Sequence, residues 1–473
     1  MAALSEAMLS EPLLRVAIGL GGVLFFLVAG NGLASCFPVL RSVRRGGRLG
    51  ISYLLGVASV SGAVYALSHL FRTPIRTASI GTALVFIGAG LVTRLRNRPE
   101  AALRSTARIK RRTQRLAAVA LLIGGFSSLG ILMDALARPV TDWDSRMTWN
   151  TQARYIRGDG RVDARALADP AVSLAHPRYP VLMPLAQVIV QEVFSAGEDD
   201  RLIRPLYAAF YPALLLTLYE AAAFLVGAPW AGAAVLAATL APFIAFESHG
   251  GATGCYSDLP LACFWGTGLL LLCRKRLEIS TGLLAGILLG AAILTKNEGL
   301  PLALSALAAA GSMTLGSVHR ARRWPVFLAS VPALLAAWLL WSWRSHIPER
   351  FDENYLAGAS LGKVLRGFAA NAGEIARGIF SASTRLDHWG LLWCAVALIV
   401  MLGAKSLVRR PGLPLSLALA GALATYLSAY ALTGGRLPEL IEVTWGRFLL
   451  QMSLPLLVLF ALALKRIVDP EPV

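Results

Sequence analysis

The chain has 473 residues, of which 56% are hydrophobic and 15% are charged, and its mean hydropathy is +0.61. These values exclude an ordinary soluble globular domain and favour a polytopic membrane protein. The formal net charge of +18 does not indicate nucleic-acid binding, because Lys and Arg cluster in short loops between apolar runs. The five cysteines are scattered, so the sequence predicts no disulfide framework and no cysteine metal site.

Thirteen apolar runs are candidates for membrane-spanning helices, which need about 20 residues. In chain order they cover 13–38, 50–71, 77–94, 116–137, 203–226, 229–247, 259–274, 279–295, 299–316, 325–343, 389–404, 413–431 and 446–465. The sequence therefore predicts an all-α polytopic membrane protein with about 13 transmembrane helices. The first run follows two glutamates instead of a basic stretch, so we expect a retained anchor and no cleaved signal peptide.

The distribution of basic residues predicts the orientation of these spans. The loop 94–115 carries nine Lys or Arg and one Glu, which places it in the cytoplasm and the segment 138–202 outside. A further apolar run at 180–197 is ambiguous in type. If it does not cross, the later basic clusters at 274–276 and 319–323 also lie inside. We therefore expect 180–197 to lie in, or dip into, the outer interface.

The stretch "VTDWDSRMTWNTQARYI" (140–156) places Asp142 and Asp144 directly after an apolar run. One interpretation is that the two carboxylates cap a helix end in water. Acidic residues at a helix C-terminus oppose the macrodipole, however, which favours a functional interpretation. In that interpretation a carboxylate acts as a general base where a membrane-bound substrate meets water.

Four later stretches carry polar residues at the same predicted outer face: "AHPRYP", "YSDLP", "TKNEG" and "TWGRFLL". Each has a structural alternative. His176 starts an interfacial helix, Asp258 is an N-cap, Lys296 and Glu298 form a local ion pair, and Arg447 anchors a span at the interface. Because all of them fall on one face, we expect a single outer site. Charges at the membrane boundary are costly unless paired, solvated or functional.

The order of these elements resembles the glycosyltransferase C superfamily, including protein O-mannosyltransferases and lipid A aminoarabinose transferases. The matching stretches are DWD (142–144), HPRYPVLMPL (176–185), DLP (258–260), TKNEG (295–299) and RFL (447–449). The first is similar to the "WDAWxxWNxKAR" pattern of bacterial members, through Trp143, Asp144, Trp149, Asn150 and Arg154. The chain departs from the family pattern in two places. "HPR" replaces a Lys-Pro-Pro, and Asp142 stands where Gly is common.

The resemblance implies a glycosyltransferase C-like transmembrane domain over 116–465, with a long first catalytic outer loop, 138–202, that carries juxtamembrane helices. A second outer loop covers 344–388. Residues 1–115 form a three-span N-terminal extension, and 466–473 form a cytoplasmic tail. The location implied is the bacterial plasma (inner) membrane, with the active site facing the outside or periplasm.

The function implied is transfer of a sugar from a polyprenyl-phosphate donor to a lipid, glycan or protein acceptor, with inversion at the anomeric carbon. Asp144 is the expected general base, with Asp142 beside it. Cations must neutralise the leaving phosphate. The residues expected to do so are Lys296, Arg447, Arg178 and His176, and the supporting residues are Asp258, Glu298, Asn150 and Arg146.

Two alternatives remain open at this point. Asp142, Asp144 and Asp258 offer three oxygen ligands of the kind that Mg²⁺ or Mn²⁺ takes, although family members with monosaccharyl lipid donors generally need no metal.

A transporter or flippase of a lipid-linked or small polar substrate is the rival function. It would place polar residues on interrupted helices at mid-membrane, whereas here they concentrate at the ends of spans. A non-catalytic scaffold would leave the Lys-Glu turn without a role. The expected partners are membrane lipids and the lipid-linked donor, and no nucleic acid.

Overall fold

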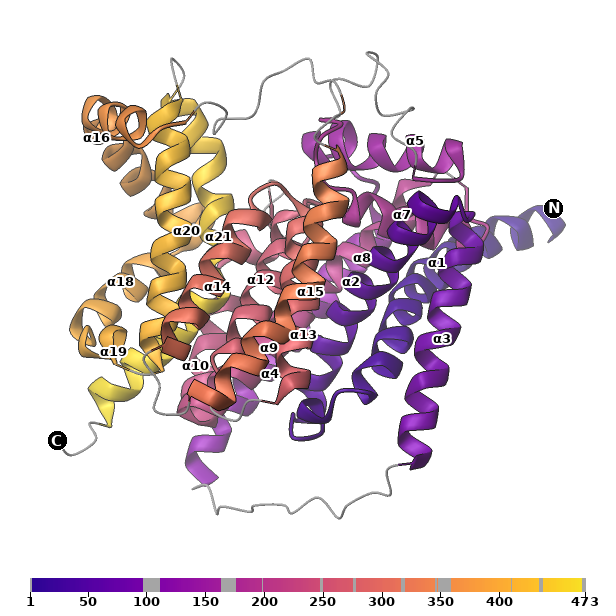
Figure 1. The fold of residues 1–473 in the computed structure, drawn as a ribbon. Coiled ribbons are helices and arrows are strands. Elements are labelled where there is room, and N and C mark those ends of the chain that lie inside the picture. Colours follow the sequence, from indigo (N-terminus) through magenta and orange to yellow (C-terminus); the bar gives the residue numbers. More distant parts are fainter. Residues whose placement is uncertain are drawn as a thin grey trace.

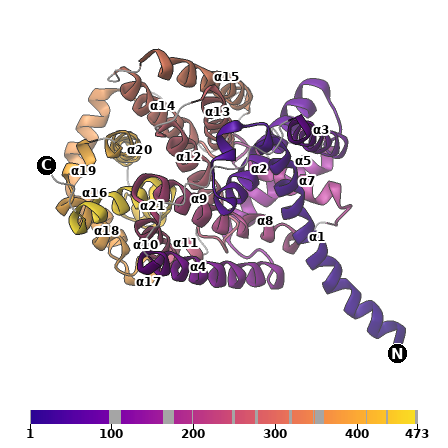
Figure 2. The ribbon, with the colours of Figure 1, turned by 90° about the horizontal axis from the view of Figure 1, so that it is seen from below.

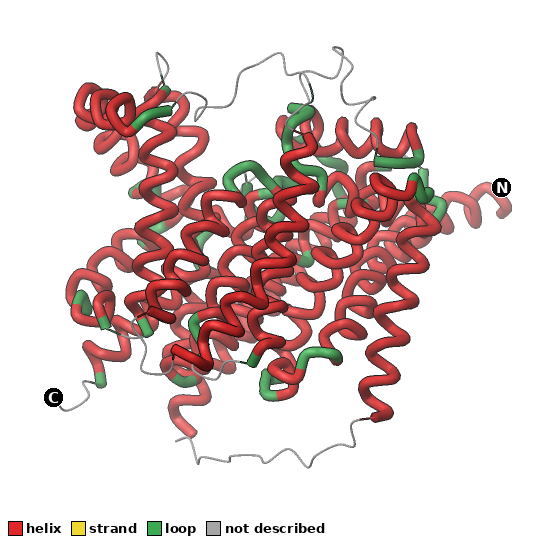
Figure 3. Tube along the Cα trace, in the orientation of Figure 1, coloured by secondary structure: helices red, strands yellow, loops and turns green. Residues whose placement is uncertain are grey.

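The computed structural model describes residues 2–96, 111–162, 176–197, 199–246, 250–274, 278–315, 320–344, 347, 359–409, 411–433 and 437–469. Within these ranges the chain is helical and contains no strand (Figure 3). The centre of the basic loop (97–110), residues 348–358 of the second predicted outer loop and the terminal residues 470–473 lie outside the described residues. The all-α prediction is confirmed.

Eight segments of the described chain are long and apolar enough to cross a membrane. They lie in α1 (Ala2–Ser35), α2 (Arg45–Phe71), α3 (Ile75–Arg96), α4 (Arg111–Ala137), the pair α8 (Arg204–Ala208) and α9 (Phe210–Val226), α15 (Arg320–Arg344), α20 (Gly412–Leu432) and α21 (Leu437–Val468). Each coincides with a run predicted from the sequence. The chain is therefore a polytopic membrane protein of helical type.

The other five predicted spans correspond to shorter apolar helices. They are α10 (Ala228–Thr239), α12 (Asp258–Leu272), α13 (Ile279–Thr295), α14 (Gly299–Leu315) and α18 (Leu392–Leu402). The predicted span 229–247 is divided into α10 and α11 (Pro242–Ala245), because Ala241 takes an extended backbone ahead of Pro242. Each of these helices is shorter than the about 20 residues that cross a bilayer unaided. A total of thirteen spans therefore stays a prediction.

The spans run side by side, and several other helices gather at one end of the bundle (Figure 1). This end, which we call the site end, carries α5 (Thr151–Asp159), α7 (Leu182–Val193) and α16 (Leu361–Ser383). The helices α3 and α21 both finish at the opposite end. Seen along the bundle, α12 lies in the interior, with α9, α13 and α21 around it (Figure 2). Every residue of α12 is buried, which places its first residue in the core of the protein.

The ambiguous run 180–197 contains the helix α7, which has only 12 residues and is too short to cross a membrane. Its residues from Leu182 to Gln191 are all buried, under contacts with α2, α3, α5 and α13. The helix is therefore covered by protein. The sequence had predicted a position in the outer membrane interface. Its polar side is covered as well, because Gln187 is buried and its Nε2 donates to Tyr207 Oη at 2.7 Å.

The N-terminal helices α1 and α2 cross at a pair of glycines. A Cβ added to Gly30 would lie 1.9 Å from the Ser52 carbonyl oxygen, and one added to Gly56 would lie 1.9 Å from the Phe26 carbonyl oxygen. Small residues of this kind let two helix backbones approach closely within a membrane. The two glycines therefore fix how closely α1 and α2 pack.

We predict that Gly56→Ala lowers the stability of the purified protein by about 1–3 kcal/mol, because the new methyl group forces the two backbones apart. Gly62 lies on the same helix with nothing within 4 Å of an added Cβ, so Gly62→Ala is the matched control. Thermal unfolding in detergent measures both variants. Equal melting temperatures for the two would contradict the close crossing.

Candidate functional site

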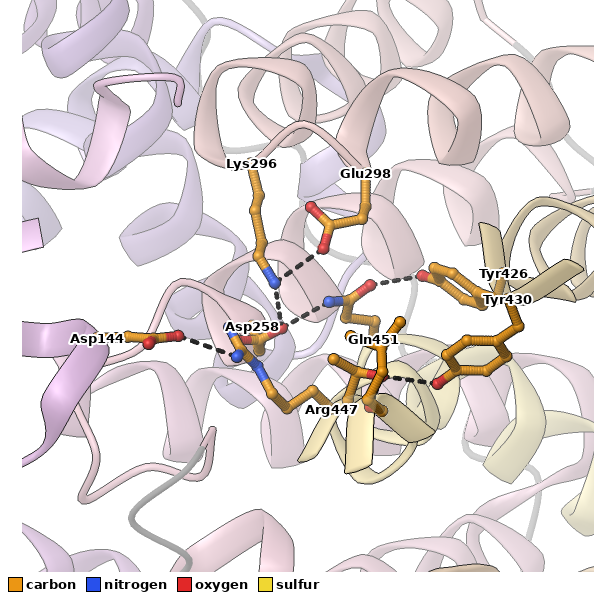
Figure 4. Close-up of polar contacts among 10 residues, drawn as sticks. Asp144, Asp258, Lys296, Glu298, Tyr426, Tyr430, Arg447 and Gln451 are labelled. Carbon is orange, nitrogen blue, oxygen red and sulfur yellow. Dashed lines mark hydrogen bonds and ion pairs between the residues drawn. The ribbon is translucent and has the colours of Figure 1, made fainter. Parts of the chain in front are cut away.

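A buried carboxylate, that of Asp258, is the centre of a polar cluster at the site end (Figure 4). Its Oδ1 accepts hydrogen bonds from Lys296 Nζ at 2.9 Å and from Gln451 Nε2 at 2.5 Å. Its Oδ2 accepts from Arg447 Nε at 3.0 Å. A buried charge is stable only with partners of this kind. The N-cap interpretation was wrong: Ser257 is the N-cap of α12, and Asp258 is the first helical residue, with both oxygens in tertiary contacts.

Lys296 reaches Asp258 from the turn that joins α13 to α14. The helix α13 ends at Thr295 and α14 begins at Gly299, so only three residues separate them, as the sequence predicted. A Cβ on Gly299 would lie 1.9 Å from the Ala292 carbonyl oxygen, so a side chain there would prevent the turn from closing. Lys296 Nζ also pairs with Glu298 Oε1 at 2.9 Å. The local ion pair is therefore present, but as one part of the cluster.

The helix α21 contributes two side chains to the cluster from one face. Arg447 and Gln451 are four residues apart, which places them one turn from each other. Gln451 Oε1 in turn accepts a hydrogen bond from Tyr426 Oη of α20 at 2.5 Å. Neither Gln451 nor Tyr426 was predicted from the sequence as a site residue. A glutamine one turn after Arg447 within an apolar span was the available signal, because polar residues inside spans usually have a specific partner.

Asp144 joins the cluster through Arg447, whose Nη1 lies 2.9 Å from Asp144 Oδ2. The guanidinium group also lies over the ring of Tyr256, 4.9 Å from its centre. The backbone N–H of Asp144 donates to Tyr256 Oη at 3.3 Å. Burial raises the pKa of the Tyr256 phenol, and the Asp144 carboxylate raises it further, so this phenol stays neutral. Tyr256 is a third site residue, after Gln451 and Tyr426, that was not predicted from the sequence.

The local backbone around Asp144 differs from the one expected. The helix α4 ends at Ala137, and a new helical stretch begins near Asp142, whose carbonyl accepts from Arg146 N at 3.0 Å. Asp142 and Asp144 therefore stand at a helix N-terminus, where acidic residues are favourable. The predicted position of the two aspartates at a helix C-terminus was wrong. A π-helical turn, Ser145–Asn150, follows at once, and such turns are frequent at functional sites.

Asp142 faces different surroundings from Asp144. It lines a cavity of about 340 Å³ together with Asp134, Arg204 and five other residues, none of them from the Asp258 cluster. Arg204 is buried there, and its Nη2 lies 2.7 Å from Asp134 Oδ2 and donates to the Thr253 carbonyl at 2.9 Å. Asp142 thus lines a cavity to which the charged residues of the Asp258 cluster do not contribute.

The other predicted site residues are not part of the Asp258 cluster in the contacts that the structure shows. The carbonyl of His176 accepts from Gln152 Nε2 at 2.8 Å, and the His176 ring stacks on Tyr179. Arg178 Nε donates to the carbonyl of Ile347 at 2.8 Å. Of the remaining two, Asn150 is buried and Arg146 is exposed. His176 and Arg178 hold chain segments together here, so a direct phosphate contact by either remains a prediction.

The exposure of the charged side chains differs in a way that distinguishes their roles. Asp258 is fully buried and Lys296 is 4% exposed, whereas Asp144 is 32% exposed. Arg447 and Glu298 lie between these values, at 15% and 23%. Asp144 is therefore the carboxylate of the cluster that a bound molecule can reach most readily. Asp258 is inaccessible and acts as the anchor for the two cations.

Three carboxylates and two cations make up the charged part of this cluster, which gives it a formal charge of −1. Among the described residues no group of three or more His, Cys, Asp or Glu side chains is placed to hold a metal ion. The oxygens of Asp258 and Asp144 that face the cluster are bound by Lys296, Gln451 and Arg447. These three donors occupy the places that a divalent cation would need, so the side chains do not fit a metal ion at this position.

Comparison with protein-family models, with curated proteins and with solved structures finds no match to this chain. The assignment of a function therefore depends on the motifs of the sequence and on the geometry of the Asp258 cluster.

We predict that Asp258→Asn destabilises the protein by about 3–5 kcal/mol, because it leaves the buried charge of Lys296 without its main anion. Asp387 is the matched control: it pairs with Arg385 at 2.7 Å but is 64% exposed. Its surface pair contributes little to stability, so Asp387→Asn should melt like the wild type. Thermal unfolding of the purified proteins compares them, and a wild-type melting temperature for Asp258→Asn would be inconsistent with a buried ionic anchor.

Proposed function

We propose that this protein is an inverting membrane glycosyltransferase that moves a sugar from a polyprenyl-phosphate donor to an envelope acceptor. In this proposal the site end faces the outside or periplasm of a bacterial plasma membrane. The supporting observation is that Lys296 and Arg447 both pair with Asp258, and that Asp144 joins them through Arg447, at one end of the spans. These are the stretches that carry the resemblance to the glycosyltransferase C superfamily, and they are far apart in the chain.

Asp144 is the general base in this proposal. The acceptor hydroxyl must lose its proton as it attacks the anomeric carbon from the side opposite the leaving phosphate. Among the cluster carboxylates Asp144 is the most exposed, and it stands at the edge of the apolar spans. A polyprenyl tail stays in lipid, so the sugar is presented at that edge. One carboxylate that activates the acceptor, without a second acting as nucleophile, favours inversion.

Arg447 links the base to the donor phosphate. Its Nε is held by Asp258, while Nη1 is on Asp144. Because the cluster already has a formal charge of −1, a donor phosphate can enter only by replacing a carboxylate at one of the cations. Asp144 is the exposed partner and is the one replaced. Phosphate binding then places Arg447 on the leaving group and frees Asp144 to take a proton.

Lys296 supports the same step from the other side of Asp258. Its ammonium group has three donors, and two of them are directed to Asp258 and Glu298. The positive charge stays close to the leaving phosphate through the reaction, where it stabilises the charge that develops there. No step requires a metal ion.

We predict that Asp144→Asn reduces sugar transfer by about 10²–10⁴-fold, because the amide cannot accept the proton. Binding of polyprenyl phosphate should persist, since the variant removes a competing negative charge from Arg447. The matched control is Asp142→Asn, which lies in the separate cavity and should transfer at nearly the wild-type rate. The assay is transfer of a radiolabelled sugar from polyprenyl phosphate by purified protein in nanodiscs. Normal transfer by Asp144→Asn would remove this residue from the mechanism.

We predict that Arg447→Lys weakens the binding of polyprenyl phosphate by about tenfold to a hundredfold, the cost of a lost hydrogen bond to a charged group. A lysine keeps the charge, but as a point charge it cannot contact Asp258 and the phosphate together as the guanidinium fork does. Arg385→Lys, at a partly exposed arginine outside the cluster, serves as the control. Titration of the purified proteins with polyprenyl phosphate gives the Kd. An unchanged Kd for Arg447→Lys would rule out a phosphate contact at this residue.

A further inference from the structure

The helix α16 lies across the site-end tips of α20 and α21, whereas the spans beneath it run along the bundle (Figure 1). Its packed face carries Gly367, Ile375, Gly378 and Ala382, which recur eight, three and four residues apart and so lie on one side of the helix. A Cβ on Gly367 would lie 2.0 Å from the Ala431 carbonyl oxygen, and one on Gly378 would lie 2.9 Å from Ile441. Ile375 and Ala382 on the same face are buried. This face fixes α16 on the end of α20 and the start of α21.

A second face of α16 is apolar but is not covered by the protein. Leu361, Leu365 and Phe368 recur at helical spacing and are 39–75% exposed. Ala376 continues the same row and is also exposed. Phe380 borders the row near the end of the helix and is 70% exposed. Large apolar side chains that form a continuous row on the surface indicate an interaction with a partner or a membrane.

The third face of α16 is basic. It carries Lys363, Arg366 and Arg377, all of them exposed, against a single acidic residue, Glu374. A helix with an apolar row and a flanking basic row has the pattern of helices that lie in a membrane surface. The apolar row enters the boundary between headgroups and acyl chains, and the basic row contacts the headgroups. Anionic lipids fit this face better than zwitterionic ones, because their charge is complementary to that of the basic row.

We propose that α16 is a membrane-surface helix that binds anionic lipid headgroups of the leaflet at the site end. The occupant is the lipid surface itself. The helix lies at the level where the spans end (Figure 1), its apolar row is exposed, and Leu386 and Leu391 just after the helix are also exposed, at 64% and 69%. The proposal concerns binding of bulk lipid and does not depend on the sugar-transfer reaction.

The test compares spin labels on two faces of α16 in the full-length protein. Cys394 is exposed and Cys36 is partly exposed, so both are first replaced by Ser, while the other three cysteines are buried. Labels are then placed at Leu365→Cys on the apolar row and at Ala370→Cys, an exposed position on the basic side. The protein is reconstituted in nanodiscs of phosphatidylcholine, with or without phosphatidylglycerol. Collisions with oxygen report a lipid environment, and collisions with a water-soluble nickel complex report an aqueous one.

The expected result is that oxygen reaches the label at 365 and the nickel complex reaches the label at 370. Phosphatidylglycerol should carry the label at 365 deeper, and the triple variant Lys363→Gln, Arg366→Gln, Arg377→Gln should abolish this dependence. Each basic side chain near an anionic surface strengthens binding by about fivefold. A label at 365 that meets the nickel complex, or neither reagent, would show water or a protein in place of lipid and overturn the proposal. Equal depth in the two lipid mixtures would overturn the selection for anionic lipids.

Discussion

The site end of this protein is organised by one buried charge, the carboxylate of Asp258. An ionised group in an apolar interior is costly unless every oxygen is paired and hydrogen-bonded. Here the partners come from three places in the chain: the turn after α13, two side chains of α21, and, through Arg447, the segment that follows α4. Each of these segments is therefore held in position by the need to pair the Asp258 carboxylate. Lys296 and Arg447, which pair with it, are also cations that the proposed chemistry uses.

The lengths of the helices explain how a charged cluster can lie inside an apolar bundle. The 15 residues of α12 rise about 22 Å, which is less than the about 30 Å of a bilayer core. Because α12 and α13 are short, the turn at 296–298 and Asp258 lie deeper in the bundle than the site-end tip of a longer helix such as α21. Asp258 contacts Arg447 and Gln451, which follow the start of α21 at Leu437. Gly299 makes this possible on one side by letting the chain reverse against Ala292. Polar residues at the ends of short helices thus form an enclosed site without interrupting a long span.

The sequence predicted much of this arrangement and missed the parts that depend on packing. Asp144, Lys296 and Arg447 were identified because ionisable residues at span ends are conspicuous against an apolar background. Gln451 was missed because an uncharged residue within a span gives a weaker signal. The burial of α7 and the contact of Arg178 with the Ile347 carbonyl depend on segments distant in the chain, which periodicity does not report. The helix polarity at Asp142 was misjudged because α4 ends at Ala137 and a new helical stretch begins near Asp142. The sequence shows only one boundary there, between an apolar run and a polar stretch.

The membrane surface and the proposed site are connected through the first turns of α21. Trp445 Nε1 donates to Ser383 Oγ at the end of α16 at 2.7 Å, and Arg447 follows two residues later. Gly446, between them, packs against Phe243, where a Cβ would lie 2.7 Å from that ring. A hydrogen bond thus links α16, which we propose lies on the lipid surface, to the part of α21 that carries Arg447. In the proposed reaction the donor is held at the same surface by its lipid tail, so the two proposals together place the phosphate and the Arg447 guanidinium group at one depth.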